Sequence, residues 1–181
     1  MFIDTHAHLY LQQFDTDKSA VVGSATKMGV QKICLPNIDS STTKAMIKME
    51  EDFPDICYAC IGLHPCYVKS GFENEIAHIK DQLESRKFYG IGETGIDLHW
   101  DKTYKALQIK AFEIQILLAI EYDLPIIIHS REALDLTIEL IAKHQNGSLK
   151  GIFHCFNGTI EQCKQIQDLG FHMGLGGGCY L

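Results

Sequence analysis

Residues 2–9 of this chain, FIDTHAHL, place two histidines directly after a short apolar segment. We expect residues 2–4 to form a β-strand, and side chains two apart in an extended segment point the same way. His6 and His8 can therefore converge on one metal ion, since imidazole nitrogens are common ligands of divalent metals. Taken alone, the pair is equally compatible with histidines that form local hydrogen bonds in the core or on the surface.

A polar side chain of a metal-binding type recurs at the ends of three later apolar runs. Glu93 ends the run YGIGE, His129 ends PIIIH, and His154 lies in GIFHCF. Burying a neutral polar group without a partner costs on the order of 2–7 kcal/mol, and burying a carboxylate costs more. Five such groups at the same end of four strands are hard to explain as independent accidents. The pattern therefore predicts that they converge on a metal site.

Apolar runs of strand length alternate with segments of helical periodicity along the chain. The expected strands cover residues 2–4, 32–36, 56–62, 88–93, 125–129, 151–155 and 171–175. This alternation predicts an α/β fold with parallel strands joined by right-handed helical crossovers. A doubly wound open sheet and a closed barrel both fit the alternation. The polar strand ends favour a TIM-type (β/α) barrel, because active sites of that fold lie at the carboxyl ends of the strands.

Apolar stripes predict about six amphipathic helices between these strands. Ile76, Ile79 and Leu83 form one such stripe at helical spacing. The longest expected helix runs from about residue 102 to residue 122, with Asp101 as its N-cap. Its expected apolar face comprises Tyr104, Leu107, Ala111, Ile114 and Leu118.

Five segments together, in this order and spacing, resemble the TatD family of metal-dependent deoxyribonucleases. They are FIDTHAHL, IGLHP, IGETGIDLHW, LPIIIHSREA and GIFHCFNGT, and the resemblance runs from residue 2 to about residue 177. That family belongs to the amidohydrolase-like (β/α)-barrel hydrolases, so the resemblance implies the same barrel that the strand ends favour.

The resemblance also implies a pair of divalent ions in the mouth of the barrel. Carried over by position, His6 and His8 hold one ion. Glu93 bridges the two ions as the catalytic carboxylate, and His129 and His154 hold the other. Such a pair activates water and neutralises the charge that develops on a phosphoryl group. Imidazole-rich ligation favours Zn²⁺ or Mn²⁺, whereas the resemblance suggests Mg²⁺, so the identity of the ions stays open.

Four further residues are candidates for contact with substrate. His64, in GLHP, is expected to bind phosphate or to be a loop histidine with local hydrogen bonds. Arg131 can clamp a phosphate with its planar fork of donors, or form an ion pair with Glu132 or a neighbour where a helix begins. Asp97 can orient a ligand histidine or a water molecule, or cap its loop. Trp100, the only tryptophan, can stack on a base if it is exposed, or pack against the barrel rim.

The C-terminal end departs from the resembling family. There, a further aspartate follows a later strand and completes the site as a ligand and general base, whereas no such motif follows Cys179 here. We therefore expect residues 1–181 to form a single metal-dependent hydrolase barrel domain that lacks its closing C-terminal elements. Its sheet would be open between the first and seventh strands, and such an edge is an aggregation hazard. For that reason a fragment of a longer enzyme is favoured over a self-sufficient short one.

The predicted function is hydrolysis of DNA phosphodiester bonds by metal-activated water. Two alternatives stay open: another amidohydrolase-type barrel hydrolase, and a non-catalytic metal-binding remnant, which the missing aspartate motivates. Many barrel amidohydrolases bridge their metals with a carboxylated lysine on the fourth strand. Glu93 stands at that position, which favours the nuclease.

Composition limits the classes of protein that fit. The chain has 181 residues, of which 46% are hydrophobic and 22% charged, which excludes a disordered chain. No apolar run approaches the ~20 residues of a membrane span. The net charge of −7 argues against a broadly basic nucleic-acid surface, although metal ions can supply positive charge locally. Seven cysteines and the lack of a signal-peptide pattern favour a cytoplasmic protein with reduced thiols, and the expected partner is DNA.

Overall fold

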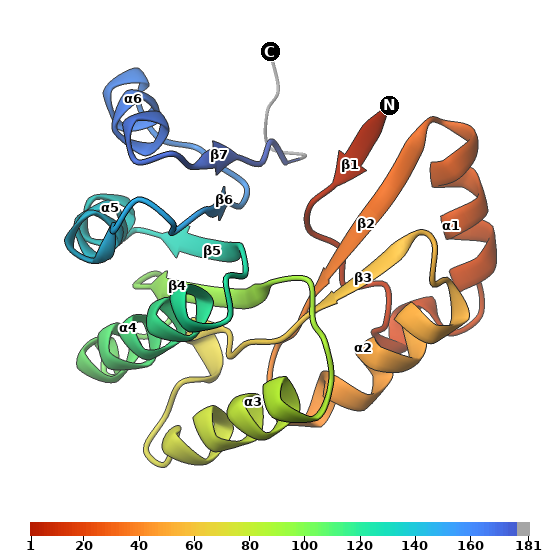
Figure 1. Cartoon of the computed structure of the whole chain (residues 1–181), viewed down its shortest axis with the longest axis horizontal. Coiled ribbons are helices and arrows are strands. Elements are labelled where there is room, and N and C mark those ends of the chain that lie inside the picture. Colours follow the sequence, from red (N-terminus) through yellow and green to blue (C-terminus); the bar gives the residue numbers. More distant parts are fainter. Residues whose placement is uncertain (177–181) are drawn as a thin grey trace.

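Strands and helices alternate through the computed structural model, which describes residues 1–176 (Figure 1). The strands are β1 (Phe2–Asp4), β2 (Val30–Pro36), β3 (Cys57–Cys60), β4 (Ile91–Asp97), β5 (Ile126–Arg131), β6 (Gly151–Phe153) and β7 (His172–Met173). The α-helices are α1 (Lys18–Lys27), α2 (Ser40–Asp52), α3 (Glu73–Ser85), α4 (Lys105–Glu121), α5 (Leu134–His144) and α6 (Ile160–Asp168). Short 3₁₀ helices lie at Gln12–Phe14 and Pro65–Tyr67.

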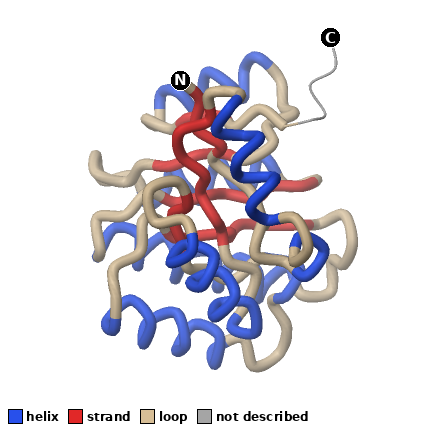
Figure 2. The backbone as a smooth tube through the Cα atoms, turned by 90° about the vertical axis from the view of Figure 1, so that its right-hand side faces the viewer, coloured by secondary structure: helices blue, strands red, loops and turns tan. Residues whose placement is uncertain are grey.

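The strands follow one another in chain order, and every pairing is parallel. Strands β1-β2-β3 form one sheet and β4-β5-β6-β7 form another, and a parallel bridge between Ile61 and Ile91 joins them. Figure 2 shows the strands on the inside and helices around them. Sequential order with helices on the outside is the arrangement of a (β/α) barrel, and a doubly wound sheet would reverse its order. The predicted TIM-type fold with about seven strands and six helices is confirmed.

The first and last strands lie across an open seam. Within residues 1–176, β1 pairs only with β2 and β7 pairs only with β6. A groove of about 760 Å³ separates them, lined by residues of β1 and of the segment around β7. Phe2 and Ile3 are therefore 65% and 53% exposed although both are apolar. Within the described residues, the edge between the first and seventh strands is unpaired.

Strand β4 extends further than the apolar run predicts. The expected strand covered residues 88–93, whereas β4 runs through Asp97 and all its residues are buried. Glu93 therefore lies within the strand, and Asp97 ends it. Gly95 allows the close approach of β4 to β5, because its φ is +136° and an added Cβ would lie 2.0 Å from the carbonyl oxygen of His129. Asp97 stays buried beyond the apolar run because Gln108 binds its main chain and His129 contacts its carboxylate.

Helix α4 also differs from its prediction in start and in orientation. Asp101 is not its N-cap: the Asp101 carboxylate accepts the Thr103 N–H at 2.7 Å in a preceding turn, and the helix begins at Lys105. Two glutamines, Gln108 and Gln115, lie on the buried face. The residues expected on the buried face are divided: Ala111 and Leu118 are buried, but Tyr104, Leu107 and Ile114 are only partly buried. The glutamines displace the predicted apolar face because they bind main-chain groups near the site.

The hydrophobic core lies between the strands and the helices outside them. Its largest fully buried side chains come from both layers and include Leu35, Ile61, Ile91, Phe112 and Phe153. Burying one such side chain stabilises the fold by about 1.5–3 kcal/mol. None of the helices within residues 1–176 has the length and apolar character needed to cross a membrane.

Candidate metal centre

Four histidines surround the carboxylate of Glu93, whose side chain is buried. Glu93 Oε2 lies 3.0 Å from His6 Nε2 and 3.2 Å from His8 Nε2. Glu93 Oε1 lies 3.0 Å from His129 Nδ1 and 3.4 Å from His64 Nε2. Each carboxylate oxygen therefore faces its own pair of imidazole nitrogens.

These side chains fit a pair of metal ions. Within residues 1–176, His6, His8 and Glu93 form one group of potential ligands, and His64, Glu93 and His129 form another. His6 Nε2 and His8 Nε2 lie 3.0 Å apart, so two ring nitrogens meet where only one can donate a proton. Spacings near 3 Å are those of donor atoms around a cation bound at ~2.0–2.2 Å. The donor set is the imidazole and carboxylate set that divalent transition metals prefer.

The charge of Glu93 suits this purpose. Burial alone would raise the pKa of Glu93, but its contacts with the rings of His129, His6, His64 and His8 hold that pKa well below its usual range. Glu93 is therefore ionised and can bind cations through both oxygens. Burial would lower the pKa of His129, but contacts with Glu93 and with a second carboxylate outweigh it and raise that pKa.

His154 lies against His6 and apart from His129. The rings of His154 and His6 stack with centroids 3.4 Å apart at an interplanar angle of 17°. Neither group of potential ligands within residues 1–176 includes His154, and His64 instead stands beside His129. Burial and the neighbouring His6 lower the pKa of His154 to about 4, so this ring is neutral near pH 7, as a metal ligand must be.

Asp97 binds the ring of His129 from the side opposite Glu93. Asp97 Oδ2 lies 2.8 Å from His129 Nε2, and Asp97 Oδ1 accepts the backbone N–H groups of His99 and Trp100 at 3.0 and 3.2 Å. Asp97 therefore both orients a candidate ligand and caps its loop, the two roles considered from the sequence. With its Nε2–H donated to a carboxylate, His129 presents Nδ1 toward Glu93.

Arg131 and Trp100 form the rim of the site. Arg131 is paired in register with Asp97 at the end of β5, and its guanidinium lies 5.2 Å above the Trp100 ring. Within residues 1–176, Arg131 forms no ion pair with Glu132 or with another carboxylate, and Glu132 contacts His99 and Lys102 at 2.7 and 3.7 Å. Trp100 is 70% exposed, which excludes its burial against the barrel.

Tyr10 fixes the ring of His8 and was not predicted from the sequence. The Tyr10 hydroxyl donates its only hydrogen to the carbonyl oxygen of Pro36, and His8 Nδ1 lies 2.8 Å from the same hydroxyl. His8 Nδ1 must then be the donor in that contact, which leaves the lone pair of His8 Nε2 free for a metal. The signal was the spacing HAHLY, which puts Tyr10 two residues after His8.

Two buried glutamines of α4 bind main-chain groups on the side of the site that carries His129 and His64. Gln108 Oε1 accepts the N–H of Asp97 at 2.9 Å, and its amide donates to the Asp97 carbonyl at 3.1 Å. Gln115 binds Leu63, the residue before His64, in the same way at 2.8 and 3.3 Å. No sequence pattern separates such glutamines from those of a solvated helix face.

Comparisons with known proteins place the sequence in a family. The sequence profile of the family described as "TatD related DNase" matches residues 3–180. An uncharacterized metal-dependent hydrolase of Bacillus subtilis, YabD, is 37% identical over 98% of this chain and 69% of its own length. A protein named 3'-5' ssDNA/RNA exonuclease TatD, of Edwardsiella piscicida, is 28% identical over 97% of this chain and 67% of its own length.

A solved structure shows the same fold. The TatD homologue YjjV of Escherichia coli superposes with a TM-score of 0.89 at 31% identity, over 97% of this chain and 68% of YjjV. The resemblance drawn from the five sequence segments is thereby confirmed. The chain belongs to the TatD-related DNase family of metal-dependent hydrolases.

Proposed function

We propose that this chain hydrolyses phosphodiester bonds of DNA with water activated at two divalent ions. The observation that carries the proposal is the position of Glu93, whose two oxygens each face a separate pair of imidazole nitrogens. Two cations held there would lower the pKa of water and neutralise the charge that develops on a phosphoryl group.

The ligands divide between the two sides of Glu93. His6 and His8 would hold one ion together with Glu93 Oε2, and His129 would hold the other together with Glu93 Oε1. The family resemblance assigns His154 to the second ion. His64 Nε2 lies on the same side of Glu93 as His129 and is placed to bind that ion or a phosphate oxygen beside it.

Two residues at the rim support binding and orientation. Asp97 holds the tautomer of His129 that exposes Nδ1. No carboxylate within residues 1–176 forms a salt bridge with Arg131, so its guanidinium donors are available to a phosphate. This local positive charge offsets the acidic character of the chain as a whole.

The names of related proteins limit the range of possible substrates, and the ligand atoms limit the range of possible metal ions. Several relatives at 25–28% identity carry the name 3'-5' ssDNA/RNA exonuclease, which supports a nucleic-acid substrate. Four imidazoles around one carboxylate favour Zn²⁺ or Mn²⁺, and the family resemblance keeps Mg²⁺ as a third possibility.

Elemental analysis combined with nuclease assays tests the proposal. We expect bound divalent metal, and metal-dependent release of nucleotides from single-stranded DNA, double-stranded DNA or RNA. Glu93→Ala should reduce that release to the level of chelated protein. Glu113→Ala is the matched control, because Glu113 contacts Lys143 and His144 on the helical layer, away from Glu93. Full metal occupancy without hydrolysis of any phosphoester, or activity that survives Glu93→Ala, would contradict the proposal.

A further inference from the structure

Trp100 has an exposed aromatic side chain and is hydrogen-bonded through its backbone to Asp97 of the candidate metal centre. Its ring is 70% exposed, and its backbone N–H donates to Asp97 Oδ1 at 3.2 Å. The other oxygen of Asp97 contacts the candidate ligand His129 at 2.8 Å. One carboxylate therefore ties the position of Trp100 to that of a metal ligand.

The orientation of the indole is fixed by its neighbours. His99 meets the ring edge-on, with centroids 4.8 Å apart at 82°, and the backbone of His99 is also held by Asp97. The guanidinium of Arg131 covers one face at 5.2 Å, a cation–π contact supplied by the neighbouring strand. Since most of the ring is still exposed, the opposite face is open to solvent.

The surroundings of this open face match a nucleic-acid strand. Leaving a large aromatic surface in water forgoes the stabilisation that burial would give. Arg131 adds a positive charge that forms no salt bridge within the described part of the chain. Trp100 also lines a small cavity of about 50 Å³ together with Lys69 and others. Aromatic rings combined with unpaired cations are how proteins bind single strands without reading their sequence.

Resting on the proposed function, we propose that the open face of Trp100 stacks on a base of the strand whose phosphodiester binds at Glu93. Arg131 holds the other face of the indole, and its donors reach the phosphate beside that base. Stacking of this kind accepts any base, because every base has a flat π-face. The subsite therefore selects for unpaired nucleotides and against phosphoesters that carry no base.

Indole fluorescence tests stacking without relying on hydrolysis. Trp100 is the only tryptophan, so any change in indole emission reports on this residue alone. The probe is a six-nucleotide single-stranded phosphorothioate DNA, added in the presence of Mg²⁺, together with a strand of the same charge in which every base is absent. We expect the normal strand to quench the emission and the abasic strand to leave it unchanged. Equal responses to the two strands, or no response to either, would overturn the proposal.

Steady-state kinetics give a second and independent test. Trp100→Ala should raise the KM for a normal oligonucleotide about fivefold or more, the loss expected from removing one base–aromatic stack. The KM for an abasic oligonucleotide should not change, and Trp100→Phe should lie between the wild type and Trp100→Ala. An equal rise in KM for both substrates would indicate a structural role and would overturn the proposal.

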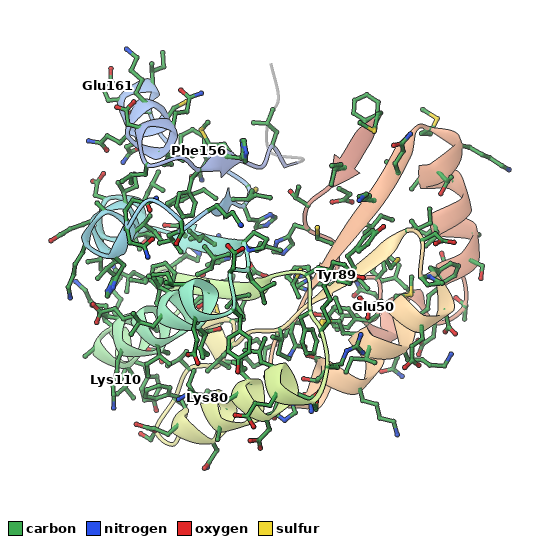
Figure 3. The ribbon with its side chains drawn as sticks, in the orientation of Figure 1. Glu50, Lys80, Tyr89, Lys110, Phe156 and Glu161 are labelled. Atoms are coloured by element: carbon green, nitrogen blue, oxygen red, sulfur yellow. The ribbon has the colours of Figure 1, made fainter. Side chains whose placement is uncertain are left out.

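Tyr89 provides the matched control. Tyr89, labelled in Figure 3, is 43% exposed, and Lys87 lies 5.4 Å above its ring. It precedes the amino end of β4, whereas Trp100 follows the carboxyl end in the sequence. Tyr89→Ala should leave both KM values unchanged. If the wild type hydrolyses DNA but Trp100→Ala has the wild-type KM, the stacking subsite fails while the proposed function stands. If the wild type hydrolyses no nucleic acid, the proposed function fails, and quenching still decides whether a base stacks on Trp100.

Discussion

The two sides of Glu93 present similar donors to a metal but are supported very differently. On the His129 side, the strands β3, β4 and β5 each have neighbours on both sides. Buried glutamines fix the main chain at Asp97 and at Leu63, and Asp97 fixes the ring of His129. This half of the site is built from hydrogen bonds inside the fold.

The His6 side depends on an edge strand and one hydroxyl group. Strand β1 has three residues and pairs only with β2 within the described part of the chain. His8 is oriented by Tyr10, whereas the buried His6 Nδ1 has no hydrogen-bond partner within residues 1–176. Two sets of similar donor atoms can therefore differ in metal affinity when their side chains are oriented by different numbers of hydrogen bonds. We expect the ion on the His129 side to bind more tightly than the ion on the His6 side.

The largest expected effect is on the better-supported side. Gly95→Ala places a Cβ 2.0 Å from the His129 carbonyl oxygen at a φ of +136°. We expect a loss of roughly 3 kcal/mol or more in the free energy of unfolding, since overpacking and backbone strain add. Gly23→Ala, with nothing within 4 Å of its Cβ, is the control and should be neutral or stabilising. Urea unfolding measures both, and equal stability of the two variants would show that β4 can move away from β5.

Gln108→Leu should weaken the His129 side selectively. The substitution leaves the buried N–H and carbonyl of Asp97 without their partners, at a cost of about 1–3 kcal/mol in stability. Metal affinity on that side should fall by about 10- to 100-fold, as on loss of other groups that orient ligands. Calorimetric titration with Mn²⁺ should show this in the tighter of two binding steps. Gln165→Leu, at an exposed position of α6, serves as the control.

Tyr10→Phe should weaken the other side with a smaller effect on stability. Losing the hydroxyl removes its bond to Pro36 and the partner of His8 Nδ1, at a cost of about 1 kcal/mol. The same titration should show the weaker binding step affected and the tighter one unchanged. Tyr89→Phe, which removes an exposed hydroxyl, should change neither step. If Tyr10→Phe weakened the tighter step, the comparison of the two sides would be wrong.

The smallest expected effect is a pH dependence of the metal-free protein. His154 has its pKa lowered to about 4 in the fold, so below its ordinary value of 6.5 the unfolded chain takes up a proton that the folded chain does not. Stability conferred by this residue is therefore present above pH 6.5 and is lost as the pH falls toward 4. Urea midpoints at pH 7 and pH 5 should show the wild type losing about 1 kcal/mol more than His154→Asn, with allowance for solvent screening.

Other groups bias this measurement in known directions. The lowered pKa of Glu93 stabilises the fold above the ordinary range of a glutamate, and that contribution is also lost as the pH falls, but at lower pH than for His154. The raised pKa of His129 stabilises the fold below its ordinary range, and that contribution is lost as the pH rises through the raised value. Both groups are present in the wild type and in His154→Asn, so the difference removes their own contributions and keeps only the part that is coupled to His154. If the difference in stability between the wild type and His154→Asn were the same at pH 7 and at pH 5, the assignment to His154 would be contradicted.

The fold was predictable because its signals are local. Most of the expected strands contain an apolar run, and Glu93 and His129 each end such a run, so the order of elements follows from residues such as Ile128 and His129. The site was predictable as a set of residues, since Glu93, His6, His8 and His129 meet. The place of His154 beside His6, and of His64 beside His129, depends on how the sheet curves, which no short segment specifies.

Support for the site was much less predictable. Gln108 and Gln115 read as polar residues of a solvated face, because their partners are main-chain groups far away in the sequence. Strand β4 continues past its apolar run because Gln108 binds both the N–H and the carbonyl group of Asp97. Periodicity records the burial of apolar side chains, so it misses elements that are buried for the sake of hydrogen bonds.

The spacing of Gln108 and Gln115 along α4 fixes the distance between the end of β4 and the segment after β3. Gln115 follows Gln108 by seven positions, which is almost two full turns, or about 10 Å along the helix. One glutamine binds the end of β4 and the other binds the segment after β3, so the helix sets how far apart those two segments lie. Inserting one residue between the glutamines would turn one of them by about 100° and detach it. Substitutions on the outer face of α4 therefore leave the spacing between these two segments unchanged. Insertions and deletions between the glutamines change it.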